Sequence, residues 1–216
     1  MSSQNAKDQR LAEAAGYALL RRLAPMLSHN MAGLLQPLSM VATVLEKRLQ
    51  NPNPDFATLI SKSSHLKSLT REASNTCMSL MTWLAPNPNE RVGLAAGITD
   101  ASELVMTELS LKGFSIVNKV GDLHAELPYS LIRMVYIAAL LALTDATTAP
   151  ADVILEAELV DSGVILTISL QPAQRERVLG RLASYRNIEW YDVQALADIH
   201  SVTLTHTSEC VKLEVR

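Results

Sequence analysis

The chain has 216 residues, a formal net charge of -3 and an isoelectric point near 6.0. This length accommodates one large domain or two small domains with adequate cores, and the weak negative charge excludes a general basic field that would attract nucleic acid or anionic lipid. Cys77 and Cys210 are isolated in the sequence, so neither a disulfide framework nor a cysteine metal site is expected, and a reduced cytosol is the simplest location.

The amino-terminal segment gives no sign of a secretory signal, because residues 1–10 are polar and contain no apolar stretch. The longest nearly apolar run, residues 131–143, is interrupted by Arg133. It is also shorter than the roughly 18 to 20 residues that cross a bilayer. We therefore expect a cytoplasmic protein that has no membrane or nucleic-acid partner.

Two helical segments come first in the chain. Residues 8–23 are rich in alanine and leucine and lead across Pro25, where a helix can break, into residues 24–50. In the second segment apolar side chains recur at alternating spacings of four and three, which is the seam of a helix in a bundle or coiled coil. This seam consists of Leu27, Met31, Leu34, Leu38, Val41 and Leu45. His29 then falls at the heptad position farthest from the seam, so its side chain should face water.

The residues around His29 favour access by another protein. Ala32 and Gly33, one turn later, carry almost no side chain, although Gly33 lowers helix propensity by roughly 1 kcal/mol relative to alanine. Pro37 removes an internal hydrogen bond and should kink the helix. We expect Ala32, Gly33 and Gln36 to contact a docked partner.

A turn and a second long helix follow. Residues 51–55 form the turn, in which Asn53 can cap the next helix and Pro54 can take its first position. The helix extends to about Trp83, and we expect one stripe on it to face the first helix: Phe56, Leu59, Ser63, Leu66, Thr70, Ala73, Cys77, Leu80 and Leu84. Residues 1–85 would thus form a helical hairpin domain, and pairing of two copies into a four-helix bundle would bury both sides of its seam.

Residues 85–90 contain two prolines among polar residues and indicate a domain boundary. We expect residues 91–216 to form an α+β sandwich with helices on one face of a mainly antiparallel sheet. Alternating apolar residues favour strands, and Asp161-Ser162-Gly163 is a turn between two of them. The expected helices are 97–111, 128–147, 173–184 and 191–200, and the expected strands are 114–120, 153–159, 164–170, 202–206 and 211–215.

Both halves of the chain, from about Ala24 to Arg216, resemble two-component histidine kinases. Ser28-His29-Asn30, followed by Leu34-Leu35-Gln36-Pro37-Leu38, is similar to their phosphoacceptor helix, and the later order of helices and strands resembles their ATP-binding domain. In the family an acidic residue usually follows the histidine, and one subgroup has Thr or Asn four residues after it. This chain has Asn30 and Gly33 there, which counts against self-phosphorylation and phosphatase activity.

The nucleotide site of that family is not matched. Residues 137–147 resemble the helix that normally carries a magnesium-binding asparagine, and Ala142 stands at that position. The family also uses an Asp-x-Gly turn for adenine and glycine-rich loops for phosphates. After Gly163 this chain has a single glycine, Gly180. We expect a degenerate copy of the domain, with no Mg-ATP and no other cofactor.

This combination implies a dimeric histidine phosphotransfer protein, because some of these proteins resemble degenerate, ATP-free histidine kinases. His29 would be the phosphoacceptor and would pass phosphate between the aspartates of response-regulator receiver domains. A receiver brings its own magnesium, so the protein needs to supply only an accessible ring nitrogen, and Asn30 could support the ring by a hydrogen bond. The alternative, favoured by Asn30 and Gly33, is a non-catalytic pseudo-histidine-kinase that binds and regulates a kinase or response regulator.

The remaining polar and aromatic residues suggest no second site. The other histidines have no acidic or cysteine partner at ligand spacing, so we expect no metal site. Arg21 and Arg22 are interpreted as part of a solvated face, and Trp83, Trp190 and Tyr191 as packing anchors.

Overall fold

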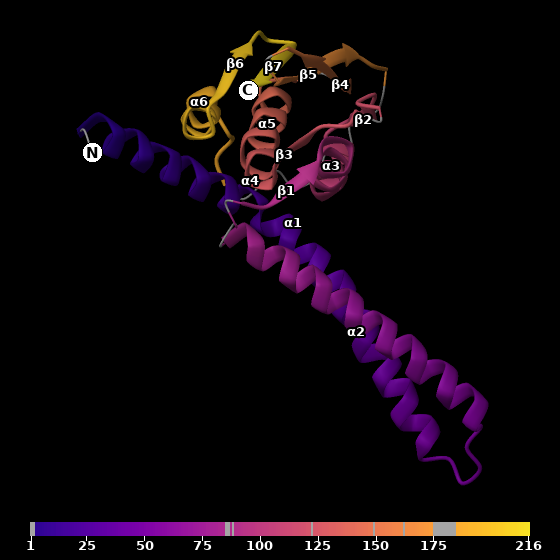
Figure 1. Cartoon of the computed structure of the whole chain (residues 1–216). Coiled ribbons are helices and arrows are strands. Elements are labelled where there is room, and N and C mark those ends of the chain that lie inside the picture. The colour runs from indigo at the N-terminus through magenta and orange to yellow at the C-terminus, as the bar shows by residue number, and fades with distance from the viewer. Residues whose placement is uncertain are drawn as a thin grey trace. The chain divides into compact units, whose positions relative to one another are not determined.

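The computed structural model describes residues 3–84, 87, 89–121, 123–148, 150–161, 163–174 and 185–216. The chain divides into two compact units (Figure 1): a helical hairpin, Met26–Pro86, and an α/β unit that joins Met1–Pro25 to Asn87–Arg216. The sequence analysis placed residues 1–85 in a single hairpin domain. The first 25 residues instead group with the α/β unit, because they bury an apolar face there.

Helix α1, Ser3–Leu49, runs without interruption through Pro25 and Pro37. The break allowed at Pro25 is therefore not present. A proline inside a helix removes one hydrogen bond and costs about 3 kcal/mol, and the many other backbone bonds of this long helix keep it intact. As a result, α1 belongs to both units, with residues before and after Pro25 on different sides of the division.

Helix α2, Phe56–Leu84, completes the hairpin. Its amino terminus is capped by Asp55, whose carboxylate accepts hydrogen bonds from the backbone N–H groups of Ala57 at 3.1 Å and Thr58 at 3.4 Å. The cap is thus two residues later than the predicted Asn53. Asp55 directly precedes the first helical residue, which is where a side chain can reach these two free N–H groups.

The predicted seam is confirmed in α1 and confirmed in part in α2. All six seam residues of α1, from Leu27 to Leu45, are half-buried. In α2, Leu59 and Ala73 are buried and Leu66 and Cys77 are half-buried, as predicted. The predicted Phe56 is 67% exposed, and Ser63 and Thr70 are exposed as well. The heptad phase of α2 places Leu59 and Ala73 on the seam and Phe56 beside it. The side chains of Leu80 and Leu84 lie outside the described residues.

The α/β unit contains most of the predicted elements. The helices are α3 (Leu94–Leu111), α4 (Tyr129–Leu131), the π-helix η1 (Ile132–Tyr136), α5 (Ile137–Asp145) and α6 (Trp190–Ile199). The strands are β1 (Arg91–Gly93), β2 (Phe114–Asn118), β3 (Glu126–Pro128), β4 (Ala151–Val160), β5 (Gly163–Pro172), β6 (Val202–His206) and β7 (Cys210–Val215). The sequence pattern did not indicate β1 and β3, which are too short to show an alternation. The predicted helix at 173–184 falls almost wholly outside the described residues.

In the described part, β2, β4, β5, β7 and β6 form one sheet in that order. β2 pairs with β4 in parallel, and the other neighbours are antiparallel, as in a mainly antiparallel layer. The β4–β5 hairpin requires Gly163, which has a φ of +148°. A Cβ atom there would lie 1.9 Å from the carbonyl oxygen of Val215.

Helices α3, α5 and α6 cover one face of this sheet (Figure 1). Every residue of α5 from Ile137 to Thr144 is buried, so this helix forms the centre of the core. The first turns of α1 add a further layer of small residues, and Gly16 brings α1 close to Leu196 of α6. The buried residues of this segment are Ala12, Ala15, Gly16, Ala18, Leu19, Arg22 and Leu23.

Candidate functional site

The predicted phosphoacceptor, His29, lies on the hairpin part of α1 with an exposed side chain. Ser28 and Asn30 on either side of it are exposed, while the adjacent seam residues Leu27 and Met31 are half-buried. This burial pattern agrees with a histidine on the face of the helix opposite the seam. Within the hairpin unit, the imidazole is therefore accessible to another protein.

The surface beyond His29 is open as well. Ala32, Gly33 and Gln36 are all exposed, and a Cβ atom built on Gly33 would meet no atom within 4 Å. Gln36 also begins a shallow groove of about 350 Å³ along α1. The groove is lined by Gln36, Ser39, Met40, Thr43, Val44 and Lys47. The part of α1 from Ala32 to Lys47 thus presents small, polar and apolar groups together.

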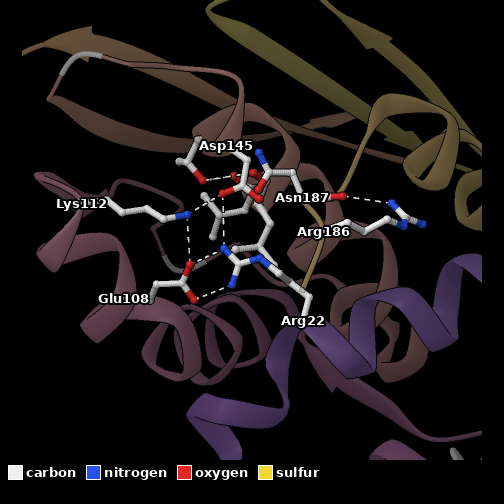
Figure 2. A network of polar contacts seen from close by, with 9 residues as sticks. Arg22, Glu108, Lys112, Asp145, Arg186 and Asn187 are labelled. Carbon is white, nitrogen blue, oxygen red and sulfur yellow. Dashed lines mark hydrogen bonds and ion pairs between the residues drawn. The ribbon is translucent and has the colours of Figure 1, made fainter. Parts of the chain in front are cut away.

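A second feature is a cluster of four charged side chains inside the α/β unit (Figure 2). Arg22 of α1 donates from Nη1 to Oε2 of Glu108 at 2.8 Å, and its Nη2 contacts Asp145 Oδ1 at 3.3 Å and Glu108 Oε1. Lys112 donates to Asp145 Oδ1 at 2.5 Å and lies 3.0 Å from Glu108 Oε1. The exposed fractions of these side chains are only 1% for Arg22, 17% for Glu108, 14% for Lys112 and 2% for Asp145.

The cluster shifts the protonation equilibria of its members. Burial by itself would lower the pKa of Arg22, but the hydrogen bond that it donates to Glu108 and the charges of Asp145 and Glu108 raise it. Burial would likewise raise the pKa of Glu108, and the hydrogen bonds and charges of Arg22 and then Lys112 hold it below its ordinary value. Both groups therefore remain ionised at neutral pH, as buried groups in a balanced cluster do.

A pocket of about 360 Å³ lies beside this cluster, and Ala142 and Asp145 form part of its wall. The other lining residues are Ala146, Asn187, Ile188, Glu189, Trp190 and Tyr191. Within the described residues, Asp145 Oδ2 and Arg22 Nε are buried without a hydrogen-bond partner. One oxygen of Asp145 is therefore committed to two cations and the other is unpaired.

Neither Ala142 nor Asp145 of this pocket is suited to hold the metal ion of a magnesium nucleotide. Ala142, which the sequence analysis aligned with a metal-binding asparagine, offers no ligand atom. Asp145, one turn later, already contacts the guanidinium of Arg22 and the ammonium of Lys112. A divalent cation at this carboxylate would face two positive charges at short range, which is unfavourable in a buried site.

The cluster was missed by the sequence analysis, which placed Arg22 on a solvated face. That prediction is wrong, because Arg22 is buried, whereas Arg21 next to it is exposed. A signal was present: Arg22 follows Ala15, Ala18 and Leu19 at helical spacing on one apolar face. An arginine within such a stripe indicates a buried partner of opposite charge.

The other histidines and aromatic residues are now placed. His65 and His124 are exposed, burial lowers the pKa of the half-buried His200, and His206 stacks on Trp190 with ring centroids 4.0 Å apart. Tyr191, predicted to be a packing anchor, is exposed because α6 turns it away from the core, and the side chain of Trp83 is outside the described residues. The described residues also offer no metal site, because no three potential ligands lie together. None of the helices in this part of the chain is long and apolar enough to span a membrane.

No protein-family model matches the sequence, and no curated protein shows significant similarity to it. Several solved structures, in contrast, are similar to this chain. The histidine kinase AdeS of Acinetobacter baumannii is 16% identical, with a TM-score of 0.48 over 83% of this chain and 96% of that one. A bacterial phosphotransferase is 15% identical, with a TM-score of 0.39 over 90% of this chain and 94% of the other. The histidine kinase ThkA, solved with the response regulator TrrA, is 12% identical, with a TM-score of 0.42 over 97% of this chain and 64% of that chain. All three matches have TM-scores below 0.5 and concern the fold alone.

Proposed function

We propose that this protein is a cytoplasmic histidine phosphotransfer protein of a two-component phosphorelay, with His29 as its phosphoacceptor. The observation that carries the proposal is the exposed imidazole of His29 on a hairpin helix, beside the open surface at Ala32 and Gly33. The motif around His29 resembles a phosphoacceptor helix, and most of the elements predicted for the α/β unit occur in their predicted order among the described residues. This combination supports phosphotransfer without requiring ATP chemistry.

The proposed reaction moves a phosphoryl group between an aspartate and a histidine. A lone pair on a ring nitrogen of neutral His29 attacks the phosphorus of a receiver's aspartyl phosphate. The phosphorus–nitrogen bond forms while the bond to the aspartate oxygen breaks, and the aspartate leaves as a carboxylate. In the next transfer the carboxylate of another receiver attacks the phosphorus and the imidazole leaves.

His29 contributes an accessible nucleophile, and the partner contributes the rest. The receiver would supply Mg²⁺ and acidic residues that neutralise the charge on the phosphoryl group. Asn30 could donate a hydrogen bond near the ring, but its amide cannot act as a general base. The groove that begins at Gln36 lies on the same helix, and we propose that a receiver domain contacts it when it reaches His29.

We also propose that the protein is a homodimer through its hairpin. Leu35 and Leu49, which are 49% and 62% exposed, share one heptad position with Ala42 and form an apolar line beside the seam. A helix with two adjacent apolar lines can pack against two neighbours, as in a four-helix bundle. A second copy of the hairpin, related by a twofold axis, would cover this line on both chains.

The test of His29 is transfer from phosphorylated receiver domains encoded in the same genome. The wild-type protein should take up label from a cognate receiver, and His29→Gln should take up none. His65→Gln is the matched control, because His65 is also exposed but lies on α2. The labelled product should be acid-labile and base-stable, as a phosphoimidazole is.

Stability provides a second readout that separates a chemical from a structural role. Because His29 is exposed, His29→Ala should change the free energy of unfolding by no more than about 0.5 kcal/mol. If His29→Gln still takes up label, another residue is the acceptor. If the wild type binds a receiver tightly and is never labelled by it, the regulatory pseudo-histidine-kinase is the better account.

A further inference from the structure

The buried cluster in the α/β unit has a balanced composition of two acids and two bases. Asp145 comes from the end of α5, Glu108 and Lys112 from α3 and its carboxyl-terminal flank, and Arg22 from the first part of α1 (Figure 2). All four side chains are at least four-fifths buried. Buried charges are costly unless they are paired. The two acids can therefore be buried only because the two bases are buried beside them, and the reverse is also true.

The two carboxylates face each other across the same cations. The ammonium of Lys112 lies 2.5 Å from Asp145 and 3.0 Å from Glu108, and the guanidinium of Arg22 also contacts both acids. Two carboxylates so close together cannot both remain ionised without compensation. In proteins such compensation comes from basic side chains or from a divalent cation, which binds carboxylate oxygens at about 2.0 to 2.6 Å.

We propose that Arg22 and Lys112 are built-in cations that take the place at Asp145 and Glu108 which a divalent metal ion would otherwise occupy. They supply two positive charges, the same total as one such ion. The α/β unit is thereby closed to divalent cations at this carboxylate pair, and the protein itself satisfies the acids. This inference deepens the proposed function, since it rests on the expectation that the domain does not use a magnesium nucleotide.

The origin of Arg22 adds a mechanical consequence. Arg22 belongs to α1, and its contacts with Glu108 of α3 and Asp145 of α5 fasten the first turns of α1 to the α/β unit. A metal ion bound to both acids would link α3 to α5 but would not hold α1. With Arg22 in place of a metal ion, the ion pairs at this site connect α1 to α3 and α5.

The test measures binding of Mn²⁺ alone to the full chain, by the electron paramagnetic resonance signal of the free ion. The Arg22→Gln/Lys112→Gln variant should bind Mn²⁺ at least about tenfold more tightly than the wild type, which corresponds to about 1.4 kcal/mol. Adding Asp145→Asn to the variant should remove that gain. Phosphotransfer at His29 is not involved in this measurement, so a failure here is distinguishable from a failure of the proposed function.

A matched control has the same change of net charge at exposed positions. Arg91→Gln/Lys119→Gln removes two cations whose side chains are about half exposed and pair with Glu126 and Glu156, and it should leave Mn²⁺ binding at the wild-type level. If the Arg22→Gln/Lys112→Gln variant is unfolded alone, Mn²⁺ should restore its helical circular dichroism. Wild-type binding as tight as that of the variant, or a variant that neither binds Mn²⁺ nor refolds with it, overturns the proposal.

Discussion

Arg21 and Arg22 are neighbours in sequence and differ completely in environment. The guanidinium of Arg21 lies 5.3 Å from the centre of the Tyr185 ring on an exposed surface, whereas that of Arg22 is buried against Glu108 and Asp145. One residue along a helix is a rotation of about 100°. The face of the helix, and not the residue type, therefore decides what an arginine contributes.

Arg22→Met should destabilise the α/β unit by about 3 kcal/mol, because it leaves two buried carboxylates with a single cation. Urea unfolding monitored by circular dichroism measures this change. Arg10→Met, on an exposed part of the same helix, should change stability by no more than about 0.5 kcal/mol. Equal effects of the two substitutions would mean that the buried cluster adds nothing to stability.

At the scale of elements, α1 has two roles along its length. Before Pro25 small residues such as Ala12 and Ala15 are buried in the α/β unit. After it, the heptad pattern presents a seam to α2 and an apolar line at Leu35 and Leu49 that the single hairpin does not cover. The change from a compact face of alanines to a leucine seam follows the division between the units.

Leu35→Glu/Leu49→Glu should convert the proposed dimer to a folded monomer. Both residues lie beside the seam, so the hairpin keeps its internal contacts while a charge becomes buried at the contact with a second copy. Sedimentation equilibrium or light scattering measures the mass, and circular dichroism measures helicity.

Gln36→Glu/Thr43→Glu is the control for this prediction, since it adds the same charge at exposed positions that each directly follow a member of the apolar line, Leu35 and Ala42. It should remain dimeric. A wild-type protein that is monomeric at micromolar concentration would show that the bundle proposal is wrong.

At the scale of the whole molecule, the core of the α/β unit surrounds α5, and the charged cluster lies at the carboxyl-terminal end of that helix. Ala142 and Asp145 are on the same short helix, so a position without a ligand atom and the ion pairs with Arg22 and Lys112 lie close together in the chain. We therefore expect the paired charges to leave no place at Asp145 for the metal ion of a bound nucleotide.

Stability of the α/β unit should fall in acid. Because the pKa of Glu108 in the folded state is below its ordinary value, its contribution is fully present above about pH 4.3 and is lost as the pH falls through the lowered pKa. Urea midpoints measured from about pH 6 to about pH 3 should decrease in the wild type. In Glu108→Gln the decrease should be smaller, and an unchanged slope would contradict the role given to Glu108.

Calorimetry of the wild type with Mg-ATP should show no heat of binding. Ala142 offers no metal ligand, and Asp145 already contacts Arg22 and Lys112. A titration with the same nucleotide into an active histidine kinase is the positive control. Binding with micromolar affinity would instead support the interpretation of this chain as an ATP-dependent histidine kinase.

The sequence by itself determined most of the elements, the hairpin seam of α1 and the exposure of His29, because these depend on local periodicity. It placed the α2 stripe only in part, since Leu59 and Ala73 were identified and Phe56 was assigned to the wrong face. Only the tertiary structure brought Arg22 to Asp145, 123 residues later in the chain. Periodicity describes neighbours on one helix, whereas the pairing of buried charges depends on which helices meet, and that is decided when the core packs.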